Sequence, residues 1–215
     1  MTRNRNFLLL CVCLLSLAGT GQAQASFAPV AAHVIQSGLP DRPGALADVT
    51  QALFNEYSAS DNVLSLVFHA YGMLRQARYF LTTGDFIRAS EYAKTGFFYL
   101  DEAVDLHEAD PRVRYLRARV DAWLAADIGR CVVTLKDTAL MLDNTQVFNA
   151  GLVEHLIGMR YRALLSCEQQ AGAEALLAKL TQQNPDAAAV LTSDRAPEWD
   201  MNEVRHVLLP LLEGK

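Results

Sequence analysis

The sequence predicts an all-α fold, and three observations support this prediction. Apolar residues recur at three- and four-residue steps, most clearly in residues 71–127, and this is the spacing of one buried helix face. No stretch alternates apolar and polar residues as a half-buried strand does. The breaks between helical stretches are short and carry glycine, aspartate or proline. We therefore expect antiparallel helical hairpins that pack on one another.

The first 25 residues have the features of a secretory signal peptide. Arg3 and Arg5 precede an apolar run, and an Ala-x-Ala site at residues 23–25 follows it. The run is shorter than the roughly 20 residues that span a bilayer. We expect cleavage before Ser26, a periplasmic or secreted mature protein, and no stable membrane span after cleavage. An uncleaved N-terminal anchor is the alternative.

Removal of this segment leaves a mildly acidic chain. Two of the 19 basic residues and none of the 24 acidic ones are lost, so the formal net charge changes from −5 to −7. Since the chain also lacks a Lys/Arg run, we expect no binding to nucleic acid. We expect residues 26–44 to be a loose lead-in with a short helix near residues 30–36, and residues 45–215 to form one helical domain.

Local signals place the first helices. Pro43 is expected in the first turn of one helix, and Ser60 is expected to cap the next, which continues to Thr83. Gly72 lies in the middle of that second helix. Glycine there costs about 1 kcal/mol relative to alanine unless a neighbouring element packs closely on it.

The following helices are separated by clear breaks. After the turn at Gly84-Asp85, a long helix should reach about residue 109, where Asp110 caps a helix that begins at Pro111. Further helices are expected at residues 111–126, 131–142, 145–166 and 172–183, the last one ended by Asn184-Pro185.

The final helix has its own start signal. Asp200 and Glu203 have the spacing of an acidic capping box, which predicts a helix that begins there. We expect this helix to cover the end of the helical stack.

The helical pairs recur along the chain. The turns at residues 84–85 and 126–127 lie 42 residues apart, and residues 167–168 lie about one such interval further on. Antiparallel helix pairs at a fixed period are typical of a helical solenoid.

One of these pairs resembles a tetratricopeptide repeat in its small, large and turn residues. These residues are Ala77, Phe80, Gly84, Asp85, Phe86, Ala89, Tyr92 and Ala93. The next unit, at about residues 110–143, lacks the turn glycine, and Gly96 stands where the family prefers alanine. The spacing also exceeds the family's roughly 34 residues.

The resemblance covers about residues 60–190. It implies a short solenoid of stacked hairpins, with a right-handed superhelix and a capping C-terminal helix. An unrelated helical bundle is the alternative.

No catalytic or metal-binding motif is recognisable. The five histidines are far apart in sequence, and there is no Cys/His group at zinc spacing, no nucleophile elbow and no phosphate loop. Asp101, Glu102, Asp105 and Glu108 are clustered, but their spacing favours the solvated face of a long helix over paired catalytic carboxylates. We predict that the protein is not an enzyme and binds neither a cofactor nor a metal.

Arginine is concentrated in the first helix of each predicted pair. Residues 60–83, 111–126 and 145–166 hold eight arginines, no lysine and three acids. In the resembled family these helices line the groove that binds partner peptides, and arginine forks bind carboxylates at two points. The candidate partner-binding residues are Tyr71, Arg75, Arg78, Arg114, Arg117 and Arg162.

We therefore expect an exported adaptor that binds a protein or peptide, with an acidic side chain or a C-terminal carboxylate in this groove. Two alternatives stay open. The arginines could instead pair with acids on neighbouring helices or lay their stems over the core. The domain could also be a helical bundle that holds a small ligand in a cavity between helices.

Two cysteines remain after the first 25 residues. Cys131 and Cys167 each lie beside a turn, and stacked hairpins place successive turns on one edge of a solenoid. An oxidising compartment favours a disulfide between them, which would stabilise the domain by about 3–4 kcal/mol. Two buried free cysteines are the alternative.

Overall fold

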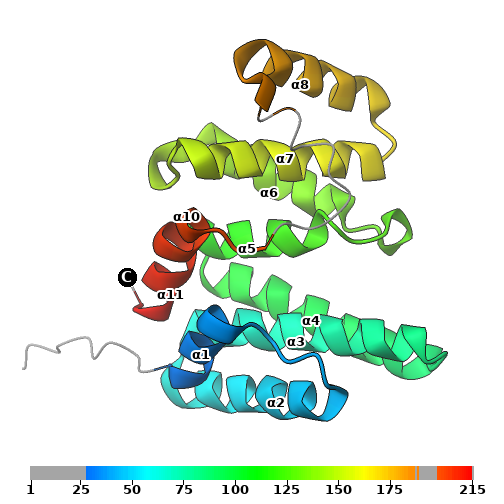
Figure 1. Ribbon diagram of the computed structural model, residues 1–215, viewed down its shortest axis with the longest axis vertical. Helices are drawn as coiled ribbons and strands as arrows, with labels where there is room; N and C mark the ends of the chain where they lie inside the picture. Colours follow the sequence, from blue (N-terminus) through cyan, green and yellow to red (C-terminus); the bar gives the residue numbers. More distant parts are fainter. Residues whose placement is uncertain (1–27, 187, 189–197, 215) are drawn as a thin grey trace, which may run out of the picture.

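The computed structural model describes residues 28–186, 188 and 198–214, and all of its regular structure in this part of the chain is helical (Figure 1). The predicted all-α class is therefore confirmed for these residues. The predicted signal segment, residues 1–25, lies outside them. None of the described helices is both long and apolar enough to cross a membrane.

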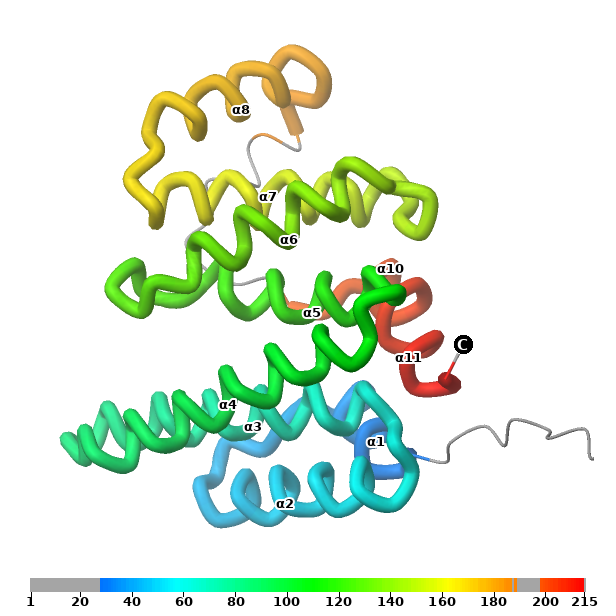
Figure 2. The backbone as a smooth tube through the Cα atoms, turned by 180° about the vertical axis from the view of Figure 1, so that it is seen from behind, coloured from blue at the N-terminus to red at the C-terminus, as the bar shows by residue number. Residues whose placement is uncertain are grey.

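Consecutive helices pack on one another in chain order, and a C-terminal stretch returns to the middle of the molecule (Figures 1 and 2). The longer helices are α1 (Pro29–Ser37), α2 (Pro43–Ser60), α3 (Val63–Thr82), α4 (Phe86–Leu106), α5 (Pro111–Asp121), α6 (Cys131–Asp143), α7 (Ala150–Ser166) and α8 (Gln170–Gln183). The short ones are η1 (Ala126–Ile128), η2 (Thr145–Val147), α10 (Met201–Glu203), the π-helical turn η3 (Val204–Leu208) and α11 (Leu209–Leu212).

Three of the predicted helix starts are confirmed. Pro43 lies in the first turn of α2. Asp110 caps α5, because its carboxylate accepts a hydrogen bond from the Arg112 backbone N–H at 2.9 Å. Asp200 and Glu203 form the predicted capping box, in which each side chain accepts a hydrogen bond from the other's backbone N–H.

Two predicted starts are wrong. Ser60 does not cap α3: it belongs to α2, where its hydroxyl donates to the Glu56 carbonyl at 2.7 Å. Asn62 is the cap instead, since its side chain accepts from the Ser65 N–H at 3.2 Å. The helix expected from residue 145 begins at residue 150, because the Asn149 side chain caps α7 there.

Two glycines allow the close approach of α2, α3 and α4. A Cβ added at Gly72 would lie 2.2 Å from Thr50 Oγ1 of α2, and one at Gly96 would lie 2.8 Å from the Leu74 side chain of α3. The close packing of α2 on α3 at Gly72 therefore offsets the low helix propensity of glycine.

The lead-in is a packed helix rather than a loose segment. Ala31 of α1 is fully buried, and the backbone N–H groups of Val30 and Ala31 donate to the Glu56 carboxylate of α2 at 2.7 and 3.0 Å. A carboxylate at a helix N-terminus satisfies N–H groups that the helix itself leaves unpaired. Glu56 therefore fixes α1 on α2.

A disulfide joins the start of α6 to the end of α7. Cys131 and Cys167 are bonded, and their Cα atoms lie 5.6 Å apart. The start of α6 and the end of α7 thus lie at the same end of this helix pair, and the bond holds the two helices side by side there.

Candidate functional site

Most of the arginines that the sequence nominated for a groove bind to acids of the same chain. Asp137 of α6 is fully buried and accepts hydrogen bonds from both Arg114 and Arg117 of α5 at 2.9 Å. Arg117 also reaches Asp101 of α4 at 3.0 Å. These two arginines therefore join three helices and do not face a partner groove.

The ion-paired cluster continues through Arg130. Its guanidinium binds Asp101 and the buried Asp121 at 2.8 Å each. Burial raises the pKa of Asp101, but the Arg130 and Arg117 guanidinium groups outweigh burial and lower it below its usual range. For Asp121 burial prevails and raises the pKa to about 6. Among the described residues Asp121 Oδ1 has no hydrogen-bond partner, which fits this weaker stabilisation of the charge.

Residues 198–214, which we call the closing segment, occupy part of the surface expected to bind a partner. Glu203 is 1 % exposed and accepts hydrogen bonds from Arg119 Nε at 2.7 Å and from the Tyr115 hydroxyl at 2.8 Å. The Arg119 guanidinium lies 3.6 Å above the Trp199 ring. The Asn62 side chain donates to the Leu212 carbonyl at 2.9 Å.

The closing segment thus contacts α3, α5 and α7, the first helices of the three predicted pairs. Its Val207, Leu208 and Leu211 are almost fully buried in the main core. The chain itself therefore fills space on the helices that the family resemblance assigned to a partner.

Tyr71 and Arg162 also bind groups of the same chain. The Tyr71 hydroxyl donates to the Leu116 carbonyl of α5 at 2.6 Å, and burial raises the pKa of this phenol well above its ordinary value. Arg162 lies with its guanidinium 5.0 Å from the Trp123 ring centre and donates to the Ala122 carbonyl. The structure therefore does not gather the six nominated residues into one groove.

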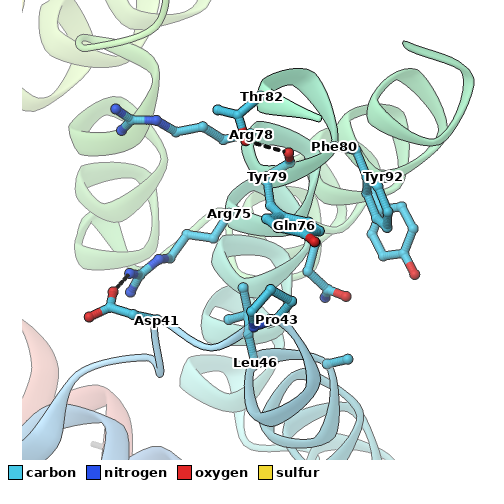
Figure 3. Close-up of a pocket in the computed structure, with 11 residues that line it drawn as sticks. Asp41, Pro43, Leu46, Arg75, Gln76, Arg78, Tyr79, Phe80, Thr82 and Tyr92 are labelled. Atoms are coloured by element: carbon cyan, nitrogen blue, oxygen red, sulfur yellow. Dashed lines mark hydrogen bonds and ion pairs between the residues drawn. The ribbon is translucent and has the colours of Figure 1, made fainter. Parts of the chain in front are cut away.

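Arg75 and Arg78 differ from the other four, because they line an open cleft. This cleft has a volume of about 420 Å³ and lies between the start of α2 and the outer half of α3 (Figure 3). Its lining residues are Asp41, Pro43, Leu46, Ala47, Arg75, Gln76, Arg78, Tyr79, Phe80, Thr82 and Tyr92.

The two arginines extend from α3 in the same direction (Figure 3). Arg75 donates to the Leu39 carbonyl at 2.8 Å and binds Asp41, whose side chain is 94 % exposed. Arg78 is exposed and forms no hydrogen bond or ion pair with the residues that the structure describes. An ion pair at such an exposed site contributes only about 0–1 kcal/mol. A carboxylate from outside can therefore replace Asp41 at small cost.

Aromatic and apolar side chains lie behind this arginine pair. Phe80 and Tyr92 pack with ring centres 5.2 Å apart on the other side of α3, and Tyr79 is 40 % exposed (Figure 3). The helical periodicity placed Phe80 and Tyr92 in a core stripe and gave no signal that they border a cleft. Only their position near a helix end, beyond the cover of the next helix, could have indicated this.

One group of side chains could hold a metal ion by its spacing. His155, Asp200 and Glu203 each offer an atom within 4.8 Å of the others. Glu203, however, already binds Arg119, and the His155 Nδ1 lies 3.0 Å from the Tyr115 hydroxyl. A cation here would lie beside the Arg119 guanidinium and be repelled by it. The arrangement instead ties the closing segment to α5 and α7.

No family model, no curated protein and no solved structure matches the chain.

Proposed function

We propose that this protein is an exported, non-catalytic adaptor with a short tetratricopeptide-like helical array, which binds a peptide segment of a partner protein. In this proposal a carboxylate of the partner binds Arg75 and Arg78. The observation that carries it is the pair of arginines that line one open cleft and extend in the same direction, one of them without any ion pair among the described residues.

The contrast between these arginines and the others supports the proposal. Arg114, Arg117 and Arg119 each bind a buried carboxylate, and their side chains are at most 14 % exposed. Such pairs are part of the folded core, since breaking one leaves a buried charge without its partner. Arg78 has no comparable structural role, so its charge is available to a ligand.

Export is supported by two independent features. Residues 1–25 have signal-peptide composition. Cys131 and Cys167 form a disulfide, a bond that persists in oxidising compartments and is rare in the cytosol.

Binding to peptides can be tested without knowing the partner. A phage-displayed library of random dodecapeptides is selected on the protein lacking residues 1–25, and the best peptide is titrated by calorimetry. We expect the peptide to carry a carboxylate that is required for binding. Arg78→Gln should weaken binding by about 10- to 150-fold, because a hydrogen bond to a charged group contributes about 1.5–3 kcal/mol. Higher salt should weaken binding further.

Arg205→Gln is the matched control, because Arg205 is an exposed arginine on the closing segment, outside the cleft. It should bind the peptide as the unchanged protein does. Equal affinity of Arg78→Gln and the unchanged protein would contradict the proposal, as would a library from which no peptide is enriched.

A small carboxylate ligand is the second candidate, and the cleft volume favours it. About 420 Å³ lies within the range of 300–1,000 Å³ typical of small-molecule sites. A thermal-shift screen separates the two candidates. Stabilisation by small carboxylates, together with no effect of the selected peptide, would favour this second function.

A further inference from the structure

The outer end of the α3–α4 hairpin presents an apolar surface next to the arginine cleft. It projects past α2 and α5 (Figures 1 and 2). Leu81, Phe86 and Ile87 are 53 %, 70 % and 75 % exposed there. Contiguous exposed apolar side chains on a soluble domain commonly mark a binding surface. We call these three residues the hairpin tip.

The turn that carries the hairpin tip is well ordered by its own hydrogen bonds. Gly84 has φ of +78°, a conformation that glycine adopts without strain. The Asp85 N–H donates to the Phe80 carbonyl at 3.0 Å, and the Asp85 carboxylate caps α4 by accepting from the Arg88 N–H at 3.1 Å. The backbone that carries the apolar side chains is therefore fixed before any partner arrives, which lowers the entropic cost of binding.

Leu81 of the hairpin tip follows the arginine pair along α3. Arg75, Arg78 and Leu81 follow one another at i, i+3 steps, which places their side chains along one ridge of α3. Tyr79, 40 % exposed, lies beside this ridge. The positively charged Arg75 and Arg78 are thus followed by the apolar Leu81 within two turns of α3.

We propose that the partner segment is an extended peptide in which an acidic residue is followed or preceded, about three residues away, by large apolar residues. The acid binds Arg75 and Arg78, and the apolar side chains cover the hairpin tip. This inference rests on the proposed peptide binding and adds the composition and spacing of the ligand. The spacing follows from the helix rise of about 1.5 Å per residue between Arg75 and Leu81, about 9 Å in all, against about 3.3 Å per residue in an extended peptide.

Charge favours a peptide over two other possible occupants, an anionic membrane and a second copy of the chain. The exposed Arg78 guanidinium can bind an anion, and a peptide carboxylate supplies one beside apolar groups. An anionic membrane would meet a domain of net charge −7 once residues 1–25 are removed. A second copy of the chain would have to present an acidic and apolar surface to the same ridge.

Two variants test the two halves of the surface separately. Phe86→Ser with Ile87→Ser removes apolar side chains that are already in water, so the fold should be retained, as circular dichroism and thermal unfolding would show. Arg78→Gln removes the open charge. Each protein is used in the same dodecapeptide selection, and the enriched sequences are compared.

The unchanged protein should enrich peptides with an acid and large apolar residues about three positions apart. The hairpin-tip variant should keep the acid and lose the apolar preference, and it should bind the original peptides about tenfold more weakly. Arg78→Gln should show the reverse. If the unchanged protein enriches an acid alone, this inference is overturned and the proposed function stands, whereas loss of all enrichment overturns both.

Two further measurements would also overturn the inference. One is sedimentation equilibrium that shows self-association of the unchanged protein but not of the hairpin-tip variant. The other is co-sedimentation with vesicles of three parts phosphatidylcholine to one part phosphatidylglycerol that depends on Phe86 and Ile87. We expect a monomer in the first measurement and no vesicle binding in the second.

Discussion

Burial determines the protonation state of His69. It is 2 % exposed and lies between the rings of Phe54 and Tyr99, at 5.0 and 4.9 Å between ring centres. Its Nδ1 donates to the Thr50 carbonyl at 2.8 Å, and its Nε2 has no hydrogen-bond partner among the described residues. Burial lowers the pKa of this imidazole, although the bond to Thr50 opposes the shift.

Because the pKa of His69 is lower in the folded protein than in the unfolded chain, the free energy of unfolding should fall as the pH is lowered. As the pH drops below the ordinary value near 6.5, the unfolded chain binds a proton before the folded one does. We expect this site alone to contribute a slope of up to about 1.4 kcal/mol per pH unit to the free energy of unfolding, until the folded protein also takes up the proton. Urea unfolding between pH 8 and 5 measures it.

His69→Gln should remove this slope, because glutamine can still donate to Thr50 but does not titrate. The difference between the two proteins isolates His69 from Asp121, whose raised pKa of about 6 acts in the opposite sense. His206→Gln, at an exposed position, should leave the slope unchanged. An identical slope in the His69 variant would contradict the prediction.

Residue types predicted the local contacts well and the distant ones poorly. Asp110, Asp200 and Glu203 were predictable as caps, because a cap binds backbone groups two or three residues away. The partners of the arginines were not. Arg117 binds Asp137, 20 residues away, and Arg119 binds Glu203, 84 residues away, so these pairs depend on packing that spacing does not determine.

The disulfide of the α6–α7 pair should contribute to the stability of the fold. Its two cysteines are separated by 36 residues, and a bond across a loop of this size should stabilise the fold by about 4 kcal/mol. Cys131→Ser with Cys167→Ser should therefore lower the free energy of urea unfolding by about that amount. Reductant should bring the unchanged protein, lacking residues 1–25, to the stability of the variant and leave the variant unchanged. Thiol titration of the denatured, unreduced protein should find no free thiol.

The apolar periodicity predicts the long helices well and the contacts between helices poorly. The long helices α3 and α4 lie close to their expected positions, because their apolar stripes are long and Gly84-Asp85 or Pro111 marks their ends. α1 was expected only as a short helix in a loose lead-in. Its order depends on Glu56, a residue of the next helix, and no signal within residues 29–37 indicates that contact.

The closing segment is held on the rest of the molecule by a buried ion pair. Glu203→Gln would leave the nearly buried Arg119 guanidinium without its carboxylate, and such a loss costs about 3–5 kcal/mol. We expect a lower urea midpoint and earlier protease cleavage within residues 198–214. Glu198→Gln, an exposed change in the same segment, should have neither effect. If both variants unfold at the same urea concentration, Glu203 does not hold the segment.

The closing segment also gives this domain a topology unlike a simple chain-order stack. Asn62 binds the carbonyls of Leu211 and Leu212, 149 and 150 residues further along the chain. In a repeat array each unit contacts only its neighbours, so assembly can proceed stepwise from any point. Here the pockets for Val207 and Leu208 on the earlier helices stay open to water until residues far downstream have been synthesised. Closure over such a long loop is slow, so a nascent chain keeps that apolar surface uncovered until its last residues have been added.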